Sequence, residues 1–183
     1  VEIDLDLIRR FDQQGPRYTS YPTADRFVES FDAAAYESWL ARRNVGAVTR
    51  PLELYLHLPF CSTLCFYCGC NKIITRNRDK GTTYLKYLYE EIALQANALG
   101  DDIKVAHMHW GGGTPNFFSL DEIGELSGQL RGHFDFDFTG EFSIELDPRT
   151  VDAAYVVGLR EFGFNRVSIG VQEILFIVSG RVQ

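Results

Sequence analysis

The pattern of hydrophobic and polar residues has two different periods along this chain. From residue 51 onward, segments with one period alternate with segments with the other. A period of two, which is typical of β-strands, is found at residues 52–58, 103–110, 142–146 and 166–172. An apolar spacing of three and four, which is typical of amphipathic helices, lies between them at residues 83–99, 119–130 and 151–162. Strands that alternate with helices in this way predict a parallel sheet with right-handed crossover connections.

Each predicted strand has one apolar face, because successive side chains of a strand point to opposite sides. The face opposite the apolar one holds Glu53, Tyr55, His57, Val105, His107, His109, Ser143, Glu145, Asp147, Ser168, Gly170 and Gln172. Strands of a parallel sheet that is covered on both sides are usually apolar on both faces. An antiparallel sheet with one wet side would give the same alternation, but the interleaved helices argue against it. The pattern therefore predicts an α/β fold, a barrel or half-barrel whose apolar faces pack on outer helices and whose polar faces line the interior.

The first 50 residues lack this rhythm and are predicted to form an N-terminal extension, whereas residues 51–183 form the barrel core. Within the extension, residues 32–43 have the apolar spacing of a short amphipathic helix. The stretch GPRYTSYPTADRF, residues 15–27, favours a surface loop on its pattern alone. Its two prolines make a poor helix and a poor central strand.

Composition and charge limit the classes of partner. A chain of 183 residues with 45% hydrophobic residues can bury the core of one domain. A net charge of −7 and a pI near 5.1 argue against nucleic acid or an anionic membrane, which require a basic face. No apolar run approaches the ~20 residues of a membrane span, and no signal segment is recognised. We therefore expect a cytoplasmic monomer that binds neither nucleic acid nor membrane.

All four cysteines, Cys61, Cys65, Cys68 and Cys70, lie close together in one loop after the first predicted strand. A disulfide framework spreads its cysteines along a short secreted chain, so this cluster favours metal binding or redox chemistry. Structural zinc usually draws its ligands from two separate knuckles, and the sequence offers one. Three thiolates with the spacing C-x3-C-x2-C can hold three corners of an iron–sulfur cubane. A zinc loop or a group of buried thiols is the alternative.

Three more motifs follow predicted strands, and in (β/α) barrels the chemistry lies at the carboxyl ends of the strands. The string GGGTP, residues 111–115, follows the second strand, Glu145 closes the third, and Gln172 closes the fourth. Glycines allow bare backbone groups to approach a ligand, as in nucleotide sites, although three glycines can also mark only a tight turn. Glu145 and Gln172 taken singly are more often surface groups. Their shared rim favours a binding site, whereas His107 and His109 are predicted to form hydrogen bonds in the barrel interior.

Several strings resemble, in the expected order, the oxygen-independent coproporphyrinogen III oxidases, a family of radical S-adenosylmethionine (SAM) enzymes. They are PRYTSYPT (residues 16–23), CSTLCFYCGCNK (61–72), WGGGTP (110–115), SIELDPR (143–149) and SIGVQ (168–172). The resemblance extends over residues 16–172 and implies a partial (β/α) barrel of the radical SAM type, with about the first four β/α units behind an N-terminal extension.

The resemblance also implies a set of site residues. Cys61, Cys65 and Cys68 would ligate three irons of a 4Fe-4S cluster, and SAM would chelate the fourth. Cys70 would be a catalytic residue near the cluster rather than a ligand. The implied SAM-binding shell comprises Tyr55, Tyr67, Gly112, Gly113, Thr114, Glu145 and Gln172. Implied or candidate contacts for a substrate with several carboxylates are Arg17, Tyr21 and the basic run Lys72, Arg76, Arg78 and Lys80, which is otherwise a solvated loop.

The implied reaction is the anaerobic conversion of coproporphyrinogen III to protoporphyrinogen IX in haem biosynthesis. In the family, a reduced cluster gives one electron to SAM, and the resulting 5′-deoxyadenosyl radical removes hydrogen from a propionate, which loses carbon dioxide and becomes a vinyl group. Two propionates react, and the family uses two SAM molecules. An electron donor such as a flavodoxin or a ferredoxin is implied as a partner.

Two alternatives accompany this hypothesis. The first is a haem chaperone-like radical SAM relative, against which Cys70 and the PRYTSYPT string argue. The second is a catalytically incompetent fragment that binds only the cluster, because a full barrel takes roughly 200 residues or more. The tail EILFIVSGRVQ, residues 173–183, departs from the family pattern, so the chain is expected to be truncated after the fourth strand. The closing GRVQ echoes a later family motif, in which Arg181 would contact SAM.

Overall fold

A computed structural model of the chain describes residues 4–12, 23–42, 51–65, 68–100 and 104–170. Its backbone contacts separate two compact units, Val1–Trp39 and Leu40–Gln183, and each unit is described by itself. The boundary expected near residue 50 falls within residues 43–50, which lie outside the described ranges. The division into an extension and a core at that point therefore stays a prediction.

The N-terminal unit contains short helices whose described residues are exposed or half-buried. Helix α1 (Leu5–Phe11) begins at Asp4, whose carboxylate accepts hydrogen bonds from the next backbone N–H groups. The 3-10 helix η1 follows at Ala24–Arg26. Helix α2 (Ala33–Arg42) confirms the amphipathic helix expected at residues 32–43. The PRYTSYPT string, with Arg17 and Tyr21, lies almost wholly outside the described residues, so its expected substrate role is untested.

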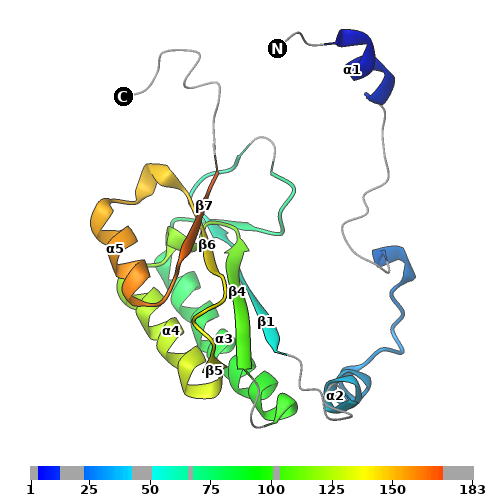
Figure 1. Ribbon diagram of the computed structural model, residues 1–183, viewed down its shortest axis with the longest axis vertical. Coiled ribbons are helices and arrows are strands. Elements are labelled where there is room, and N and C mark those ends of the chain that lie inside the picture. The colour runs from blue at the N-terminus through cyan, green and yellow to red at the C-terminus, as the bar shows by residue number, and fades with distance from the viewer. Residues whose placement is uncertain (1–3, 13–22, 43–50, 66–67, 101–103, 171–183) are drawn as a thin grey trace. The chain divides into compact units, whose positions relative to one another are not determined.

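The second unit is built on a parallel sheet, as the alternating periods predicted. Four strands are neighbours in the order β1-β4-β6-β7, which is also their order along the chain (Figure 1). Their bounds are Leu52–Leu58 for β1, Lys104–Gly112 for β4, Phe142–Leu146 for β6 and Arg166–Ile169 for β7. A short strand, β5 (Asp135–Phe136), pairs in parallel with the beginning of β4. Two further short strands, β2 (Phe60–Cys61) and β3 (Ile73–Ile74), form a separate parallel pair that frames the cysteine loop.

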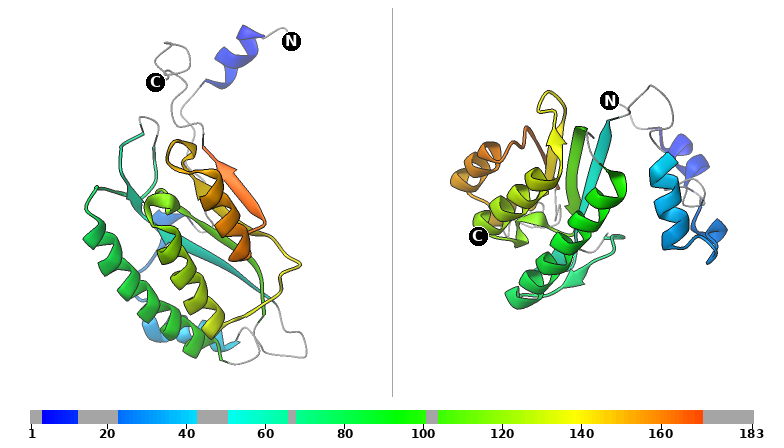
Figure 2. Two further views of the ribbon diagram at one scale, coloured as in Figure 1. Left: turned by 90° about the vertical axis from the view of Figure 1, so that its left-hand side faces the viewer. Right: turned by 90° about the horizontal axis from the view of Figure 1, so that it is seen from below.

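Three helices connect the strands and pack on the same face of the sheet (Figure 1, Figure 2). They are α3 (Arg78–Leu99), α4 (Leu120–His133) and α5 (Ala153–Glu161), and the 3-10 helices η2 (Pro115–Phe117) and η3 (Pro148–Thr150) lie in the loops. Helix α3 begins earlier than its apolar stripe indicated, because Asn77 caps it by accepting a hydrogen bond from the Asp79 N–H at 2.9 Å. The capping box of Ser119 and Glu122 at the start of α4 is confirmed.

The helices seal one side of the sheet into a core. The buried apolar residues of the sheet are Leu56, Leu58, Val105, Met108, Trp110, Phe142, Ile144 and Leu146. We call these residues the apolar face, and they pack against Leu85, Leu88 and Ile92 of α3, Ile123, Leu126 and Leu130 of α4 and Leu159 of α5. The opposite side, which we call the polar face, holds Tyr55, His57, His109, Ser143 and Glu145. Helices on one side and polar groups on the other are the arrangement expected for part of a (β/α) barrel.

One residue lies on the other face from the one predicted. Val105 was assigned to the polar face by alternation, but its side chain is fully buried on the apolar face. Leu52 pairs with Val105 and the next residue, Glu53, pairs with His107, so Ala106 is an extra residue in β4. This β-bulge reverses the alternation on its N-terminal side, which a strict period of two cannot anticipate.

Within the described part of the chain, no helix combines the length and apolar character that a membrane crossing requires.

Candidate functional site

The cysteine loop and the glycine loop meet at the carboxyl ends of β1 and β4. The Gly113 N–H donates a hydrogen bond to the Leu58 carbonyl at 2.9 Å, and the Thr114 N–H donates one to the Phe60 carbonyl at 2.8 Å. These bonds extend the pairing of β1 and β4 past the ends of both strands. The motifs that the sequence placed on one rim are therefore tied together by backbone.

Glycine is required in this loop by close approach and by backbone conformation. A Cβ atom on Gly113 would lie 2.6 Å from the Pro59 carbonyl carbon and 2.7 Å from the Phe60 carbonyl oxygen. Gly112 has φ of 107°, and a Cβ there would lie 2.5 Å from the His57 ring. Backbone cannot withdraw as a flexible side chain can, so Gly113 is required where the two loops approach each other closely. The expectation that these glycines let backbone groups approach a ligand stays a prediction.

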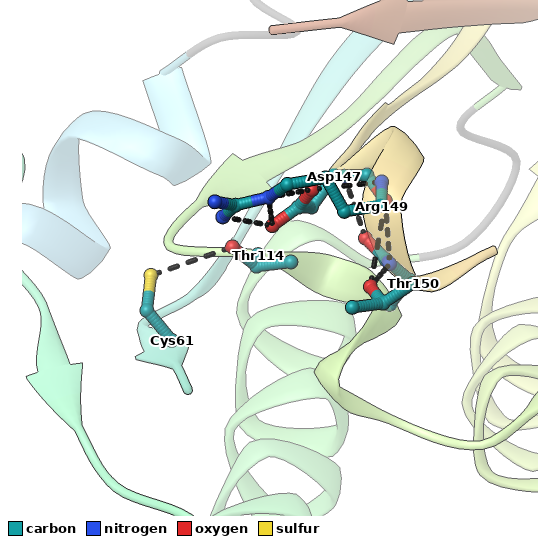
Figure 3. A network of polar contacts seen from close by, with 6 residues as sticks. Cys61, Thr114, Asp147, Arg149 and Thr150 are labelled. Atoms are coloured by element: carbon teal, nitrogen blue, oxygen red, sulfur yellow. Dashed lines mark hydrogen bonds and ion pairs between the residues drawn. The ribbon is translucent and has the colours of Figure 1, made fainter. Parts of the chain in front are cut away.

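Cys61 is a buried thiol at the centre of the rim. Its Sγ lies 3.4 Å from the Thr114 Oγ1, which joins the cysteine loop to the glycine loop through side chains as well (Figure 3). A cavity of about 230 Å³ opens beside this contact and is lined by Cys61, Cys65, Thr114 and Arg149, among others. Two of the predicted cluster ligands therefore face one cavity, at the carboxyl ends of the strands.

The thiols of the loop influence one another electrostatically. Burial raises the pKa of the Cys65 thiol, Arg149 opposes this, and the neighbouring Cys61 and Cys68 thiols raise it further. A backbone hydrogen bond from Cys70 lowers the pKa of Cys68, with help from the charge of Lys72. Partial burial and the hydrogen bond with Cys68 raise the pKa of Cys70. Several thiolates in one loop repel one another, so a positively charged partner would favour their joint ionisation.

The thiols of the cysteine loop have the chemistry to bind an iron–sulfur cluster, but the described side chains are not yet arranged around a metal position. Cysteine thiolates are the usual ligands of such clusters, and three are present in one loop. Among the described side chains, no three of the types His, Cys, Asp and Glu already surround a point where a single metal ion would sit. Tyr67 and the neighbouring residue 66 lie in the loop but outside the described ranges, so the SAM contact expected at Tyr67 is untested.

Glu145 lies on the polar face and touches the glycine loop. Its Oε2 accepts a hydrogen bond from the Gly112 N–H at 3.3 Å, and its Oε1 lies 3.3 Å from the His109 Nε2. The His109 Nδ1 lies 2.7 Å from the Ser143 Oγ, so the histidine bridges two residues of β6. His107 accepts a hydrogen bond from the Glu141 N–H at 3.0 Å, but this bond is exposed. The interior hydrogen bonding predicted for both histidines is therefore confirmed for His109, which also supports Glu145, and not for His107.

Tyr55 lies next to this group on β1. Its hydroxyl is 3.0 Å from the His57 Nδ1, and its ring stacks on His109 with 5.9 Å between ring centres. Partial burial raises the pKa of the Tyr55 hydroxyl, and the nearby Glu145 and Cys70 add to this effect. The structure thus brings together Tyr55 and Glu145, two residues of the predicted SAM shell, through their shared contact with His109. Gln172 lies outside the described residues.

A second polar group at the rim was not assigned a role from the sequence. Arg149 forms a two-pronged ion pair with Asp147, with Nε to Oδ1 at 2.9 Å and Nη2 to Oδ2 at 2.7 Å. Asn116 accepts a hydrogen bond from the Asp147 N–H at 2.9 Å, and its amide donates to the Thr150 Oγ1 at 2.6 Å (Figure 3). The only signal in the sequence was the string DPR within SIELDPR, which places an acid and a base directly after a buried strand.

Comparison with known protein families identifies the class of protein to which this chain belongs. The family model described as the Radical SAM superfamily matches residues 55–175, which include the cysteine loop, the glycine loop and the sheet. The chain belongs to the radical SAM superfamily.

Within this superfamily the similarity is to one kind of enzyme. The oxygen-independent coproporphyrinogen III oxidase of Pseudomonas aeruginosa is 46% identical over 175 residues, which are 94% of this chain and 38% of that protein. The oxidase of the same description from Escherichia coli is 44% identical over 173 residues, which are 94% of this chain and 37% of that protein. A solved structure of coproporphyrinogen III oxidase from Escherichia coli, described as a radical SAM enzyme, superposes with a TM-score of 0.82 at 42% identity.

That superposition covers 100% of this chain and 39% of the solved chain, so this chain spans well under half the length of these relatives. The family resemblance predicted from the motifs and the partial barrel predicted from the strand faces are both supported by these similarities.

Proposed function

We propose that this chain carries the cluster-binding and SAM-binding rim of an oxygen-independent coproporphyrinogen III oxidase, which converts coproporphyrinogen III to protoporphyrinogen IX in haem biosynthesis. The observation that carries the proposal is the meeting of the Cys61 thiol, the glycine loop and Glu145 at one rim. The relatives reported above bear the oxidase name, so the haem chaperone alternative is not retained. We further propose a cytoplasmic location and a small one-electron carrier, such as a flavodoxin or a ferredoxin, as the donor.

Cys61, Cys65 and Cys68 are the residues that would hold a 4Fe-4S cluster. The chemistry that the cluster and SAM supply when bound is one-electron cleavage of SAM, which starts hydrogen removal from a substrate propionate. The protein contributes local order in residues 68–72, where Lys72 donates hydrogen bonds to the Cys68 and Cys70 carbonyls, each at 3.3 Å. This anchor fixes the second half of the cysteine loop before any ligand arrives.

The glycine loop and Glu145 would bind the amino acid end of SAM. Gly112 and Gly113 have no side chains that would block an approaching ligand, and Thr114 adds a hydroxyl beside Cys61. The Glu145 carboxylate is half-exposed on the polar face and would accept hydrogen bonds from the ammonium group of SAM. His109 keeps this carboxylate in place through its contact with Oε1. Tyr55, Tyr67 and Gln172 complete the proposed SAM shell.

Cys70 is proposed as the catalytic residue nearest to the substrate. Its side chain is exposed, and it follows the proposed ligand Cys68 by two residues. A substrate that approaches the cluster from solvent could therefore reach the Cys70 thiol. An exposed thiol at this place can hold or move a proton at its Sγ without serving as a ligand.

The test is anaerobic reconstitution of the chain with iron and sulfide, followed by addition of dithionite and SAM and an assay for 5′-deoxyadenosine. We expect broad absorption in the blue visible range, four irons in each chain, and 5′-deoxyadenosine. Cys61→Ser should abolish the cluster, whereas the matched variant Cys70→Ser should retain iron and deoxyadenosine formation. Zinc in place of iron in the purified and reconstituted chain would overturn the proposal.

Substrate turnover requires a separate measurement. Coproporphyrinogen III is added to the reconstituted chain, and protoporphyrinogen IX is measured after oxidation to its fluorescent porphyrin. Deoxyadenosine without porphyrin product would support the SAM chemistry of the rim and refute turnover by this chain alone.

A further inference from the structure

The cavity beside Cys61 has two walls of different character. One wall is the cysteine loop, from which Cys61 and Cys65 face the cavity. The other wall is the segment after β6, which contributes Asp147 and Arg149. Two of the proposed cluster ligands therefore share a cavity with an ion pair to which neither the sequence motifs nor the proposed function gives a role.

The position of Arg149 is dictated by a buried network. Asp147 is 8% exposed and accepts hydrogen bonds from the Arg149 N–H at 3.0 Å as well as from the guanidinium. Asn116, which follows the glycine loop and is also 8% exposed, holds the Asp147 backbone from both sides, through N–H and C=O. Figure 3 shows the guanidinium extending from this network toward the pair formed by Thr114 and Cys61. A side chain anchored in this way keeps its charge at a fixed place.

The charge of Arg149 reaches the cysteine loop. Arg149 lines the same cavity as the Cys61 and Cys65 thiols, and its guanidinium is directed toward Cys61 (Figure 3). A fixed cation stabilises any neighbouring group that becomes more negative. One-electron reduction makes an iron–sulfur cluster more negative by one unit, and nearby charge is among the features that set its reduction potential.

We propose that Arg149, held by Asp147 and Asn116, is a positioning residue that raises the reduction potential of the cluster bound by Cys61, Cys65 and Cys68. The inference rests on the proposed cluster-binding function. Removing the guanidinium leaves the Asp147 carboxylate without its counter-charge beside the loop. The net charge beside the loop therefore falls by one unit, which disfavours the reduced state and lowers the potential.

The test is a potentiometric titration of the reconstituted chain, with the reduced cluster followed by electron paramagnetic resonance. In Arg149→Gln we expect the ratio of reduced to oxidised cluster at a fixed potential to fall about tenfold, which corresponds to about 59 mV for a one-electron couple. Arg149→Lys keeps the charge and should restore most of the wild-type potential. Iron content and the spectrum of the oxidised cluster should be the same in all variants.

The matched control is Arg166→Gln. Arg166 also pairs with a carboxylate, through Nη1 to both oxygens of Glu141 at 2.9 and 2.7 Å, but it lies at the amino end of β7, on the opposite rim. Its loss removes the same charge and a similar ion pair without changing the charge beside the cysteine loop. The potential of this variant should equal that of the wild type.

Three results would overturn the inference while leaving cluster binding intact. They are an unchanged potential in Arg149→Gln, an equal shift in Arg166→Gln, and a potential in Arg149→Lys as low as that of Arg149→Gln. If the glutamine variant does not retain iron, the reduction potential of Arg149→Lys is used to test the inference. A wild-type potential with normal iron supports the inference, and a lowered potential refutes it. Failure of the wild-type chain to bind iron would instead refute the proposed function.

Discussion

The two faces of the main sheet differ in almost every physical respect, although they are built from alternate residues of the same strands. The apolar face is sealed by α3, α4 and α5, and Leu58, Trp110 and Ile144 on it are fully buried. On the polar face Tyr55 is 58% exposed, and Glu145 and His109 keep polar atoms at its surface. Burial on the apolar face stabilises the fold, whereas the polar face and its rim hold the residues proposed to bind the cluster and SAM.

This difference predicts where substitutions will be felt. Burial of apolar surface is the main favourable term in folding, so the apolar face should govern stability. Residues of the polar face have partners that are mostly polar and partly wet, so they should govern ligand binding with small effects on stability. At the rim, where the backbones of two loops meet, substitutions should affect both stability and ligand binding. The four predictions below test this separation.

The largest effect is expected for Trp110→Ala on the apolar face. Trp110 is completely buried and meets Phe164 edge-to-face, with 4.9 Å between ring centres. Truncation to alanine should reduce the free energy of unfolding by about 3–5 kcal/mol. Urea denaturation followed by circular dichroism measures this. His109→Ala on the polar side of the same strand is the comparison, and a loss there as large as at Trp110 would break the proposed separation of the two faces.

The next effect is expected for Gly113→Ala at the rim. The new Cβ would collide with the backbone of Pro59 and Phe60, which cannot move aside without breaking the bonds between the two loops. We expect a loss of about 1–3 kcal/mol in the free energy of unfolding, measured by urea denaturation, and less bound iron after reconstitution.

Gly128→Ala is the matched control for this substitution. Gly128 lies in α4, and a Cβ there would meet nothing within 4 Å. Alanine should therefore stabilise the helix by about 0.5–1 kcal/mol. If both variants changed stability by the same amount in the same direction, the close approach at Gly113 would have no energetic consequence.

A smaller effect, confined to ligand binding, is expected for Glu145→Gln on the polar face. The neutral amide keeps the size of the side chain but loses the charge proposed to receive the ammonium group of SAM. Hydrogen bonds to charged groups contribute about 1.5–3 kcal/mol, so the dissociation constant for SAM should rise at least about tenfold. Calorimetric titration of the reconstituted chain with SAM measures this.

Glu141→Gln removes a carboxylate from the opposite rim, where it pairs with Arg166, and should leave SAM affinity unchanged. An equal loss of affinity in both variants would show that overall charge, and not the position of Glu145, controls binding.

The smallest effect concerns the acid stability contributed by Asp147. Burial opposes ionisation of this carboxyl, but the hydrogen bonds and charge of Arg149 prevail and hold its pKa below the ordinary value of 3.8. A pKa lowered by folding stabilises the fold above the ordinary value, and this contribution is lost as the pH falls through the lower, folded pKa. The stability difference between wild type and Asp147→Asn should therefore shrink as the pH falls from 5 to 3. Urea midpoints at each pH measure it, and a constant difference would contradict the prediction.

Much of the fold could be predicted from the sequence because its signals are local. The alternation in residues 52–58 and 142–146 gave both strands with their bounds, and the Ser119 capping box gave the start of α4. The clustering of Cys61, Cys65 and Cys68 predicted a thiolate site from spacing alone. Helix α3 began earlier than expected, because its first turn is specified by the Asn77 cap rather than by apolar spacing.

The tertiary structure decided the rest. The bulge at Ala106 arises from the way β4 pairs with β1, and because of it the Val105 side chain lies in the core. His109 supports Glu145, and Asn116 holds Asp147, the partner of Arg149; both contacts join residues more than 30 positions apart in the chain. The sequence by itself determined the strands, the helices and the residue types at the rim, because hydrophobic period and spacing act over a few residues. Which polar side chains face one another across that rim depended on how the strands paired, and this is a property of the folded chain alone.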